Sequence, residues 1–167
     1  MKNYQEWYEK RKSSLLGHPQ LLQLMRVFNR MMTVLMPLAY MTLLVTSFVS
    51  KGIGKDLYTY ILVPALGFVL LTIVRKWINR PRPYETWGIV PLLDKDSSGN
   101  SMPSRHVFSA TIISMACLHA NLPVGLMLLV LSALLGLVRV LGGVHYPKDV
   151  LVGYACGLLL GILFFIF

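Results

Sequence analysis

Five long stretches without a charged residue constrain this chain more than any other feature of its sequence. They cover residues 31–49, 57–74, 107–120, 122–138 and 150–167, and are 19, 18, 14, 17 and 18 residues long. A helix needs about 20 apolar residues, and at least about 17, to cross a bilayer. Four stretches reach that lower limit. The third reaches it only if its helix extends into residues 104–106, whose polar groups would then have to face a cavity rather than lipid.

The composition favours a membrane protein over a soluble or disordered chain. Only 14% of the residues are charged and 55% are hydrophobic, whereas soluble domains contain about 25% charged residues and disordered chains combine high charge with low hydrophobicity. Five such stretches also argue against the core helices of a soluble protein. We therefore predict an all-α, polytopic membrane helix bundle of about five transmembrane helices, which forms a single domain over residues 1–167.

The segment before the first stretch is predicted to be a separate helix. We place residues 1–30 in this N-terminal segment and residues 31–167 in the transmembrane core. One helical face carries Tyr4, Trp7, Tyr8, Arg11 and Leu15, so that aromatic side chains lie on it with cations beside them. Such a face is typical of an amphipathic helix that lies in the lipid headgroup layer. A solvated basic tail is the alternative, and no cleavable signal peptide is expected, because this segment holds six Lys and Arg residues but no suitable apolar stretch.

The informative polar residues lie in three segments that border the apolar stretches. Residues 75–83 read Arg-Lys-Trp-Ile-Asn-Arg-Pro-Arg-Pro, residues 101–106 read Ser-Met-Pro-Ser-Arg-His, and residues 139–149 run from an arginine to an aspartate. Ser104 is expected to cap a helix that begins near Arg105, and Pro147 suits the first turn of another. If each stretch crosses the membrane once, all three segments emerge on the same side as the N-terminal segment.

Together these segments have the chemistry of a phosphate site. Guanidinium groups and helix N-termini both bind phosphate oxygens. A histidine held by a carboxylate can attack phosphorus, and a second histidine can protonate the leaving oxygen. His145 with Asp149, and separately His106, can fill these roles without a metal, so no metal site and no cofactor are predicted. Asp94 and Asp96 are interpreted as part of a solvated loop.

At this point the sequence resembles the type 2 phosphatidic acid phosphatase superfamily of membrane lipid phosphatases. The family pattern is Lys-x6-Arg-Pro, then Pro-Ser-Gly-His, then Ser-Arg-x5-His-x3-Asp. The matching residues of this chain follow in the same order and at the same spacing: Arg75, Arg82 and Pro83; Pro103, Ser104, Arg105 and His106; Val138, Arg139, His145 and Asp149. The resemblance covers roughly residues 75–153.

The resemblance implies a role for each matching residue. His145 would be the nucleophile that forms a phosphohistidine, oriented by Asp149, and His106 would protonate the leaving group. The phosphate would be held by Arg75, Arg82, Ser104 and Arg139. Arg75 replaces the usual Lys, Arg105 the usual Gly and Val138 the usual Ser. We expect Arg105 and Lys76 to contact the lipid headgroup. The family usually has six membrane helices, with the first motif after the third, whereas here that motif follows the second.

The predicted function is metal-independent hydrolysis of a lipid phosphate monoester or diphosphate, such as phosphatidic acid, phosphatidylglycerol phosphate or polyprenyl diphosphate. A non-catalytic lipid-binding or channel-like membrane protein is the alternative. The expected partners are the lipid phosphate substrate and the surrounding membrane lipids, and no nucleic acid, because no reader motif is present. Gly153, Gly157 and Gly161 recur every four residues, which favours close packing within the chain over dimerisation. An oligomer is compatible with the sequence but not indicated by it.

The distribution of charge predicts an orientation in the cell membrane. Of the 16 Lys and Arg residues, only Lys51 and Lys55 fall on the side opposite the three polar segments. The positive-inside rule therefore favours a cytoplasmic catalytic face in a multi-pass protein of the cell membrane. Many bacterial members of the family act at the outer face, so the resemblance favours the opposite orientation.

Overall fold

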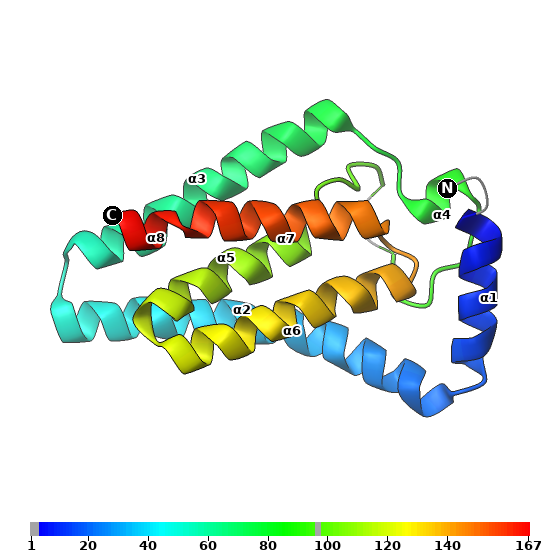
Figure 1. Cartoon of the computed structure of the whole chain (residues 1–167), viewed down its shortest axis with the longest axis horizontal. Helices are drawn as coiled ribbons and strands as arrows, with labels where there is room; N and C mark the ends of the chain where they lie inside the picture. Colours follow the sequence, from blue (N-terminus) through cyan, green and yellow to red (C-terminus); the bar gives the residue numbers. More distant parts are fainter. Residues whose placement is uncertain (1–3, 96–97) are drawn as a thin grey trace.

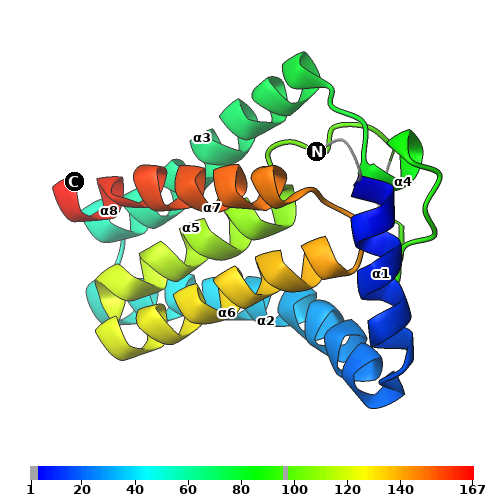
Figure 2. The same ribbon diagram turned by 45° about the vertical axis from the view of Figure 1, so that its right-hand side comes forward.

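The computed structural model describes residues 4–95 and 98–167, and these residues form a helical bundle (Figures 1 and 2). The helices are α1 (Tyr4–Leu16), α2 (Pro19–Lys51), α3 (Lys55–Ile78), α4 (Pro83–Thr86), α5 (Arg105–Ala120), α6 (Leu122–Leu141), α7 (Pro147–Gly161) and α8 (Leu163–Ile166). The long helices run roughly along one axis, while α1 lies across one end, which we call the α1 end. The predicted all-α bundle with an N-terminal helix is confirmed.

Four segments of the described residues are long and apolar enough to cross a membrane: Pro19–Lys51, Lys55–Thr86, Leu122–Leu141 and Pro147–Ile166. They contain four of the five predicted stretches. The first of these segments, α2, is much longer than the predicted stretch 31–49. It begins at Pro19, a residue suited to a first helical turn. Residue 30 therefore lies inside α2 and marks no boundary between elements. The third stretch, residues 107–120, corresponds to α5, which has 16 residues and begins at Arg105.

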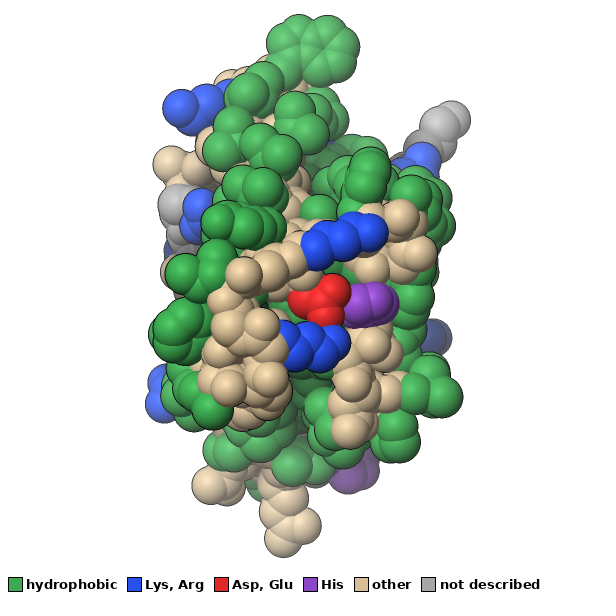
Figure 3. Space-filling model, turned by 90° about the vertical axis from the view of Figure 1, so that its left-hand side faces the viewer, with side chains coloured by type: hydrophobic (Ala, Val, Ile, Leu, Met, Phe, Trp, Pro, Cys, Tyr) green, Lys and Arg blue, Asp and Glu red, His purple; other side chains and the backbone are tan. Residues whose placement is uncertain are grey.

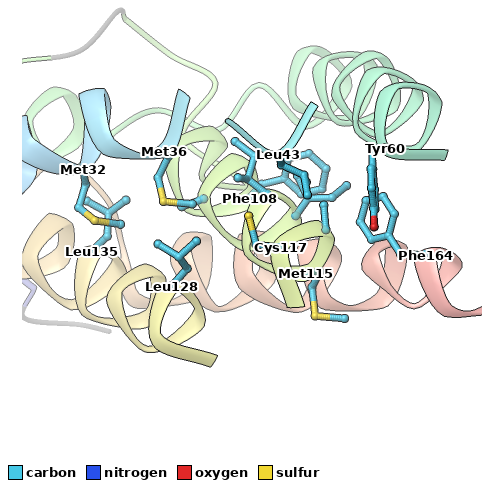
Figure 4. Packing of buried hydrophobic residues seen from close by; sticks show 14 of the residues in the cluster. Met32, Met36, Leu43, Tyr60, Phe108, Met115, Cys117, Leu128, Leu135 and Phe164 are labelled. Atoms are coloured by element: carbon cyan, nitrogen blue, oxygen red, sulfur yellow. The ribbon is translucent and has the colours of Figure 1, made fainter. Parts of the chain in front are cut away.

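The short helix α5 is the centre of the bundle. It packs against α2, α3, α6, α7 and α8, and Figure 4 shows its Phe108, Met115 and Cys117 among apolar side chains of the surrounding helices. Its polar side chains bond within the protein, because the hydroxyl of Ser114 donates to the carbonyl of Ala110 at 2.7 Å and lies 3.1 Å from the hydroxyl of Ser132 on α6. Other helices thus shield α5 from lipid.

The glycine stripe of α7 allows that helix to lie directly against α5. A Cβ atom added to Gly153 would lie 2.7 Å from the carbonyl oxygen of Ser104, and one added to Gly157 would lie 2.7 Å from Cβ of Thr111. Gly161 has a similar contact with Met115. The prediction that the stripe packs within the chain is confirmed.

We expect Gly153→Ala to destabilise the protein and lower any activity that depends on Ser104. The new methyl group would push against the backbone at the start of α5, and overpacking of this kind costs about 1–3 kcal/mol. The measurement is the thermal unfolding midpoint in detergent. Gly136→Ala on α6 is the matched control, because its Cβ would meet its nearest neighbour at an ordinary 3.5 Å. Equal midpoints for the two variants would contradict the packing described above.

Helix α1 packs its aromatic face onto the protein. Tyr4 and Tyr8 are buried, and the Tyr4 ring lies 5.0 Å from the ring of Tyr146, centroid to centroid. Tyr8 fits against Gly143, where φ is +77° and an added Cβ would lie 2.5 Å from the Tyr8 hydroxyl. The helix is present as predicted, but the face assigned to the headgroup layer is largely covered by the segment that leads into α7. The buried aromatic side chains of this face therefore contact protein.

The opposite end of the bundle carries few charges. Figure 3 looks onto this end, where α2 turns into α3, and shows a small group of basic, acidic and histidine side chains surrounded mainly by hydrophobic ones. Lys51 and Asp56 form an ion pair there at 2.6 Å.

In the predicted solvated loop, Asp94 is exposed and pairs with Arg30 at 3.3 Å. Asp96 lies outside the described residues.

Candidate active site

The three polar segments predicted from the sequence meet at the α1 end. Asn79, in a left-handed conformation with φ 40°, ends α3 and turns the chain toward the prolines that follow. The backbone N–H of Ser101 then donates to the carbonyl of Arg80 at 2.8 Å, and that of Ser104 donates to the carbonyl of Asp149 at 2.8 Å. These two backbone bonds join the end of α3 to the start of α5, and the start of α5 to the start of α7.

His145 and Asp149 are linked through a serine. Both are buried, and Nδ1 of His145 lies 3.7 Å from Oδ2 of Asp149. The Ser101 hydroxyl lies between them: it donates to Oδ2 of Asp149 at 2.5 Å and is 3.3 Å from Nδ1 of His145. Because that hydroxyl has one proton and gives it to the carboxylate, it accepts the Nδ1 proton of His145. With the proton of the imidazole on Nδ1, its lone pair lies on Nε2.

A second contact selects the same tautomer of His145. Nη1 of Arg82 lies 3.5 Å from Nε2 of His145, and a guanidinium group can only donate. Arg82 is itself fixed, because it also donates to the carbonyl groups of Val144 and Gly99, each at 3.3 Å. The nitrogen of His145 that carries the lone pair therefore faces an arginine.

Asp149 is held on both of its oxygens. Besides Ser101, the backbone N–H of Tyr146 donates to Oδ2 at 3.0 Å, and Nη1 of Arg80 donates to Oδ1 at 2.9 Å. The Arg80 guanidinium also stacks on the Tyr146 ring, 4.2 Å from its centroid. A carboxylate without access to water needs donors of this kind, and here they fix its orientation toward His145.

The arginines give the site an excess of positive charge. Arg75, Arg82 and Arg139 are all buried, and within the described part of the chain Asp149 is the single buried acidic side chain. Arg75 donates to the carbonyl of Pro103, and Nη1 of Arg139 donates to the side-chain oxygen of Asn29 at 3.2 Å. Buried cations in excess of carboxylates are stable only if an anion completes the site. Phosphate suits the fork of donors on each guanidinium group.

Ser104 occupies the predicted cap position of α5, but its hydroxyl makes no capping bond. The residue is completely buried, and its hydroxyl has no partner among the described residues. A buried hydroxyl left unsatisfied costs about 1–3 kcal/mol, so such groups usually serve a ligand or a water. The Ser104 hydroxyl, which was expected to cap α5, is therefore available to bond an oxygen atom of a bound anion.

His106 lies on the first turn of α5 and lines a mainly apolar cavity. This cavity has a volume of about 340 Å³ and lies between α2, α3, α5 and α6. Met32, Met36, Phe68 and Leu135 line it together with His106. Thr33, Tyr40 and Ser109 also line it, and a mainly apolar pocket with a few polar groups is typical of a binding site for an amphipathic ligand.

Two of the predicted contacts lie outside the buried cluster. Arg105 and Lys76 are exposed, at the start of α5 and near the end of α3. Their expected contact with a lipid headgroup remains a prediction.

Three residues of the site were not singled out by the sequence reasoning. Ser101 stands in the quoted 101–106 segment and Arg80 in the 75–83 segment, so their positions could have drawn attention to them. Asn29 lies on α2, in a part of the chain that was assigned to the N-terminal segment. No local pattern marks it as a partner of Arg139.

Burial lowers the pKa of His145 to about 4, and the nearby Arg139 and Arg82 act in the same direction. Hydrogen bonding to Asp149 opposes this effect but does not overcome it. His145 is therefore neutral at pH 7, with its lone pair on Nε2, where Arg82 approaches it.

This shift predicts a pH dependence of stability. In the unfolded chain the His145 pKa returns to about 6.5, so between that value and about 4 the unfolded state binds a proton that the folded state does not. Stability should therefore fall as the pH drops through this window, by up to about 3 kcal/mol, and be insensitive to His145 above it. Thermal midpoints in detergent at pH 7 and pH 4.5 test this. His145→Gln should lose less stability than wild type, and an equal loss would contradict the prediction.

Comparison with known proteins identifies the family of the chain. The family model described as the PAP2 superfamily matches residues 56–167, which include every motif residue of the candidate site. The chain belongs to the PAP2 superfamily. This confirms the resemblance drawn from the three motifs.

Relatives of this PAP2 chain include membrane phosphatases. Undecaprenyl-diphosphatase BcrC from Bacillus subtilis (strain 168) is 33% identical over 101 residues, which are 60% of this chain and 52% of BcrC. The chain thus spans about half the length of this curated relative. Two crystal structures are similar at 27% identity: LpxE from Aquifex aeolicus, with a TM-score of 0.72 over 90% of this chain and 88% of the other, and the transmembrane PAP2-type phosphatidylglycerolphosphate phosphatase from Bacillus subtilis, with a TM-score of 0.74 over 98% and 85%.

Proposed function

We propose that this chain is a membrane phosphatase that hydrolyses a lipid phosphate monoester or diphosphate through a phosphohistidine intermediate. The observation that carries the proposal is the setting of His145: it is buried, neutral at pH 7, and presents Nε2 beside Arg82 while Nδ1 is engaged by Ser101. The names of the relatives support lipid phosphates as the substrate class.

The proposed reaction has two steps. Nε2 of His145 attacks phosphorus, the bond to the leaving oxygen breaks, and His106 gives that oxygen a proton. Water then attacks the phosphohistidine, His106 takes a proton from it, and the phosphorus–nitrogen bond breaks to release phosphate. Asp149 stabilises the imidazolium that forms. The oxygens of the phosphoryl group are held by Arg75, Arg82, Arg139 and Ser104. No step needs a metal ion.

The lipid tail is proposed to occupy the apolar cavity next to His106. The cavity opens from the bundle between helices. The hydrocarbon tail of a substrate would lie among Met32, Met36 and Phe68 while its phosphate binds the arginine cluster. Phosphatidic acid, phosphatidylglycerol phosphate and polyprenyl diphosphate all combine such a tail with a terminal phosphate.

The test is phosphate release from these three lipids by the purified protein in detergent, with a chelator present. We expect release from at least one of them, undiminished by the chelator. Release that required added metal would contradict the metal-independent reaction. Binding of all three lipids without hydrolysis would favour the alternative of a non-catalytic lipid-binding protein.

We further propose that the α1 end faces the cytoplasm. Among the described Lys and Arg residues only Lys51 and Lys55 lie at the opposite end, where α2 ends and α3 begins, and short cytoplasmic loops are enriched in these residues. Phe167 lies at that opposite end in Figure 1. A reporter that functions only outside the cytoplasm should therefore be active when fused after Phe167 and inactive when fused before residue 1. The reverse pattern would place the site on the outer face.

A further inference from the structure

A second cavity lies next to Arg80, whose guanidinium donates to Asp149. It has a volume of about 460 Å³ and lies between α1, α4 and the start of α7, lined by Tyr4, Arg80, Thr86, Trp87, Tyr146 and Lys148 among others. His145 and Ser101 approach Oδ2 of Asp149, whereas Arg80 approaches Oδ1 from the wall of this cavity. The cavity is distinct from the candidate active site, since none of the four candidate phosphate ligands lines it.

The charge of the cavity favours an anion. Arg80 and Lys148 are its charged lining residues, and both are cationic. Lys148 is exposed, and the Arg80 side chain is 32% exposed. Asp149, by contrast, has no exposed surface and is closed off behind Arg80. A ligand in the cavity would therefore meet two cations, together with the aromatic rings of Tyr146 and Trp87.

An unsatisfied donor also points to a ligand. Tyr4 is 1% exposed, lines the cavity, and its hydroxyl has no partner among the described residues. Burial raises the pKa of Tyr4, and the neighbouring Tyr146, Tyr8 and Asp149 raise it further, so the hydroxyl keeps its proton. A buried donor of this kind is costly unless an acceptor is present. An oxygen atom of an anion between Arg80 and Lys148 would supply one.

We propose that this cavity binds a second phosphate group, either inorganic phosphate or the headgroup phosphate of an anionic lipid, and that its occupancy slows the reaction at His145. The link is Arg80, whose guanidinium donates to Asp149 in the described structure. A phosphate next to Arg80 competes for the same donors, because guanidinium groups bind phosphate in a bidentate manner. Asp149 then loses one of the restraints that orient it toward His145. This inference rests on the proposed phosphatase function.

The experiment is inhibition of lipid phosphate hydrolysis by added inorganic phosphate, in neutral detergent with chelator. Phosphate at the active site competes with substrate and raises KM alone. Phosphate at the second cavity should in addition lower kcat, by at least about 5-fold at saturation, the usual lower range for coupling between two sites. A purely competitive pattern, with kcat unchanged at all phosphate concentrations, would overturn the proposal.

Variants of the cavity make the test specific. Lys148→Ala should weaken the effect of phosphate on kcat by about 5-fold in apparent affinity, because it removes one of two cations. Tyr4→Phe should weaken it by about 3-fold, because it removes one donor. In both variants the effect on KM should persist. Lys10→Ala on α1 removes an equal charge from the surface outside the cavity and should leave inhibition unchanged. An unaltered effect on kcat in Lys148→Ala and Tyr4→Phe would overturn the assignment to this cavity.

A second arm identifies the source of the phosphate. The protein is compared in phosphatidylcholine vesicles with and without phosphatidylglycerol, a phosphodiester lipid that contains no terminal phosphate. A lower kcat in the anionic vesicles that Lys148→Ala relieves identifies a lipid headgroup, whereas an effect of inorganic phosphate alone identifies the free ion. If no lipid phosphate is hydrolysed under any condition, the proposed function fails. If hydrolysis occurs and neither source lowers kcat, only the present inference fails.

Discussion

His145→Ala should lower turnover of the lipid phosphate by at least about 1000-fold, which is typical for loss of a nucleophile that acts with other groups as a unit. The imidazole supplies the atom that bonds to phosphorus, and the surrounding arginines can only bind and polarise the substrate. Binding should be less affected, since Arg75, Arg82 and Arg139 remain. The measurements are kcat from phosphate release and the dissociation constant of a non-hydrolysed phosphonate lipid.

His119→Ala is the matched control for this variant. His119 lies at the opposite end of the bundle, where its Nδ1 is 2.8 Å from the Tyr60 hydroxyl, and its removal should leave turnover within about 2-fold of wild type. Rapid acid-free quenching with a radiolabelled substrate should trap a phosphohistidine in wild type and none in His145→Ala. Turnover by His145→Ala at the wild-type rate would refute the nucleophile assignment.

Ser101→Ala should lower kcat by about 100-fold while KM changes little. The serine touches Asp149 and His145 rather than the substrate, so its loss should affect the orientation of the nucleophile and not the binding of the phosphate. Misplacement of a reacting group by about 1 Å is enough for an effect of this size. Steady-state kinetics on one lipid phosphate gives both parameters.

Two further variants separate positioning from simple destabilisation. Ser132→Ala removes another buried serine, whose hydroxyl donates to the carbonyl of Leu128 at 2.8 Å on α6, and should retain the wild-type kcat. Ser101→Thr keeps a hydroxyl group and should recover part of the lost activity. If Ser101→Ala raised KM with kcat intact, or if Ser132→Ala matched its loss, the serine would have no positioning role.

The sequence predicted the helix ends next to the candidate site and the order of motifs, because both depend on local chemistry. Pro147 begins α7, Arg105 begins α5, and the chain leaves α3 before Pro81. The two proline-linked positions follow from the missing N–H and fixed φ of proline, whereas Ser104 precedes α5 without a capping bond from its hydroxyl. The same local rules placed His145 just ahead of α7 and Asp149 in its first turn, so the two residues were correctly expected to lie together.

What the sequence could not predict were contacts between segments that are far apart in the chain. The bond from Arg139 to Asn29 spans 110 residues, and that from Arg80 to Asp149 spans 69. Neither follows from a local pattern, since each depends on how helices pack. The aromatic face of α1 was misjudged for the same reason: Tyr4 and Tyr8 suit a headgroup layer as well as a protein surface, and only the position of Gly143 and Tyr146 decides between them.

The central position of α5 has a consequence for the biogenesis of the protein. This helix has only 16 residues and holds Thr111 and Ser114 in its buried middle, so on its own it is poorly suited to leave the translocation channel for lipid. It is joined to α6 by a tight turn at Asn121, whose side chain accepts from the N–H of Val124 at 3.1 Å, and the two helices share the Ser114–Ser132 contact. We expect the two to enter the bilayer together as a hairpin, so that the residues around Ser104 reach their place only after α6 has been synthesised.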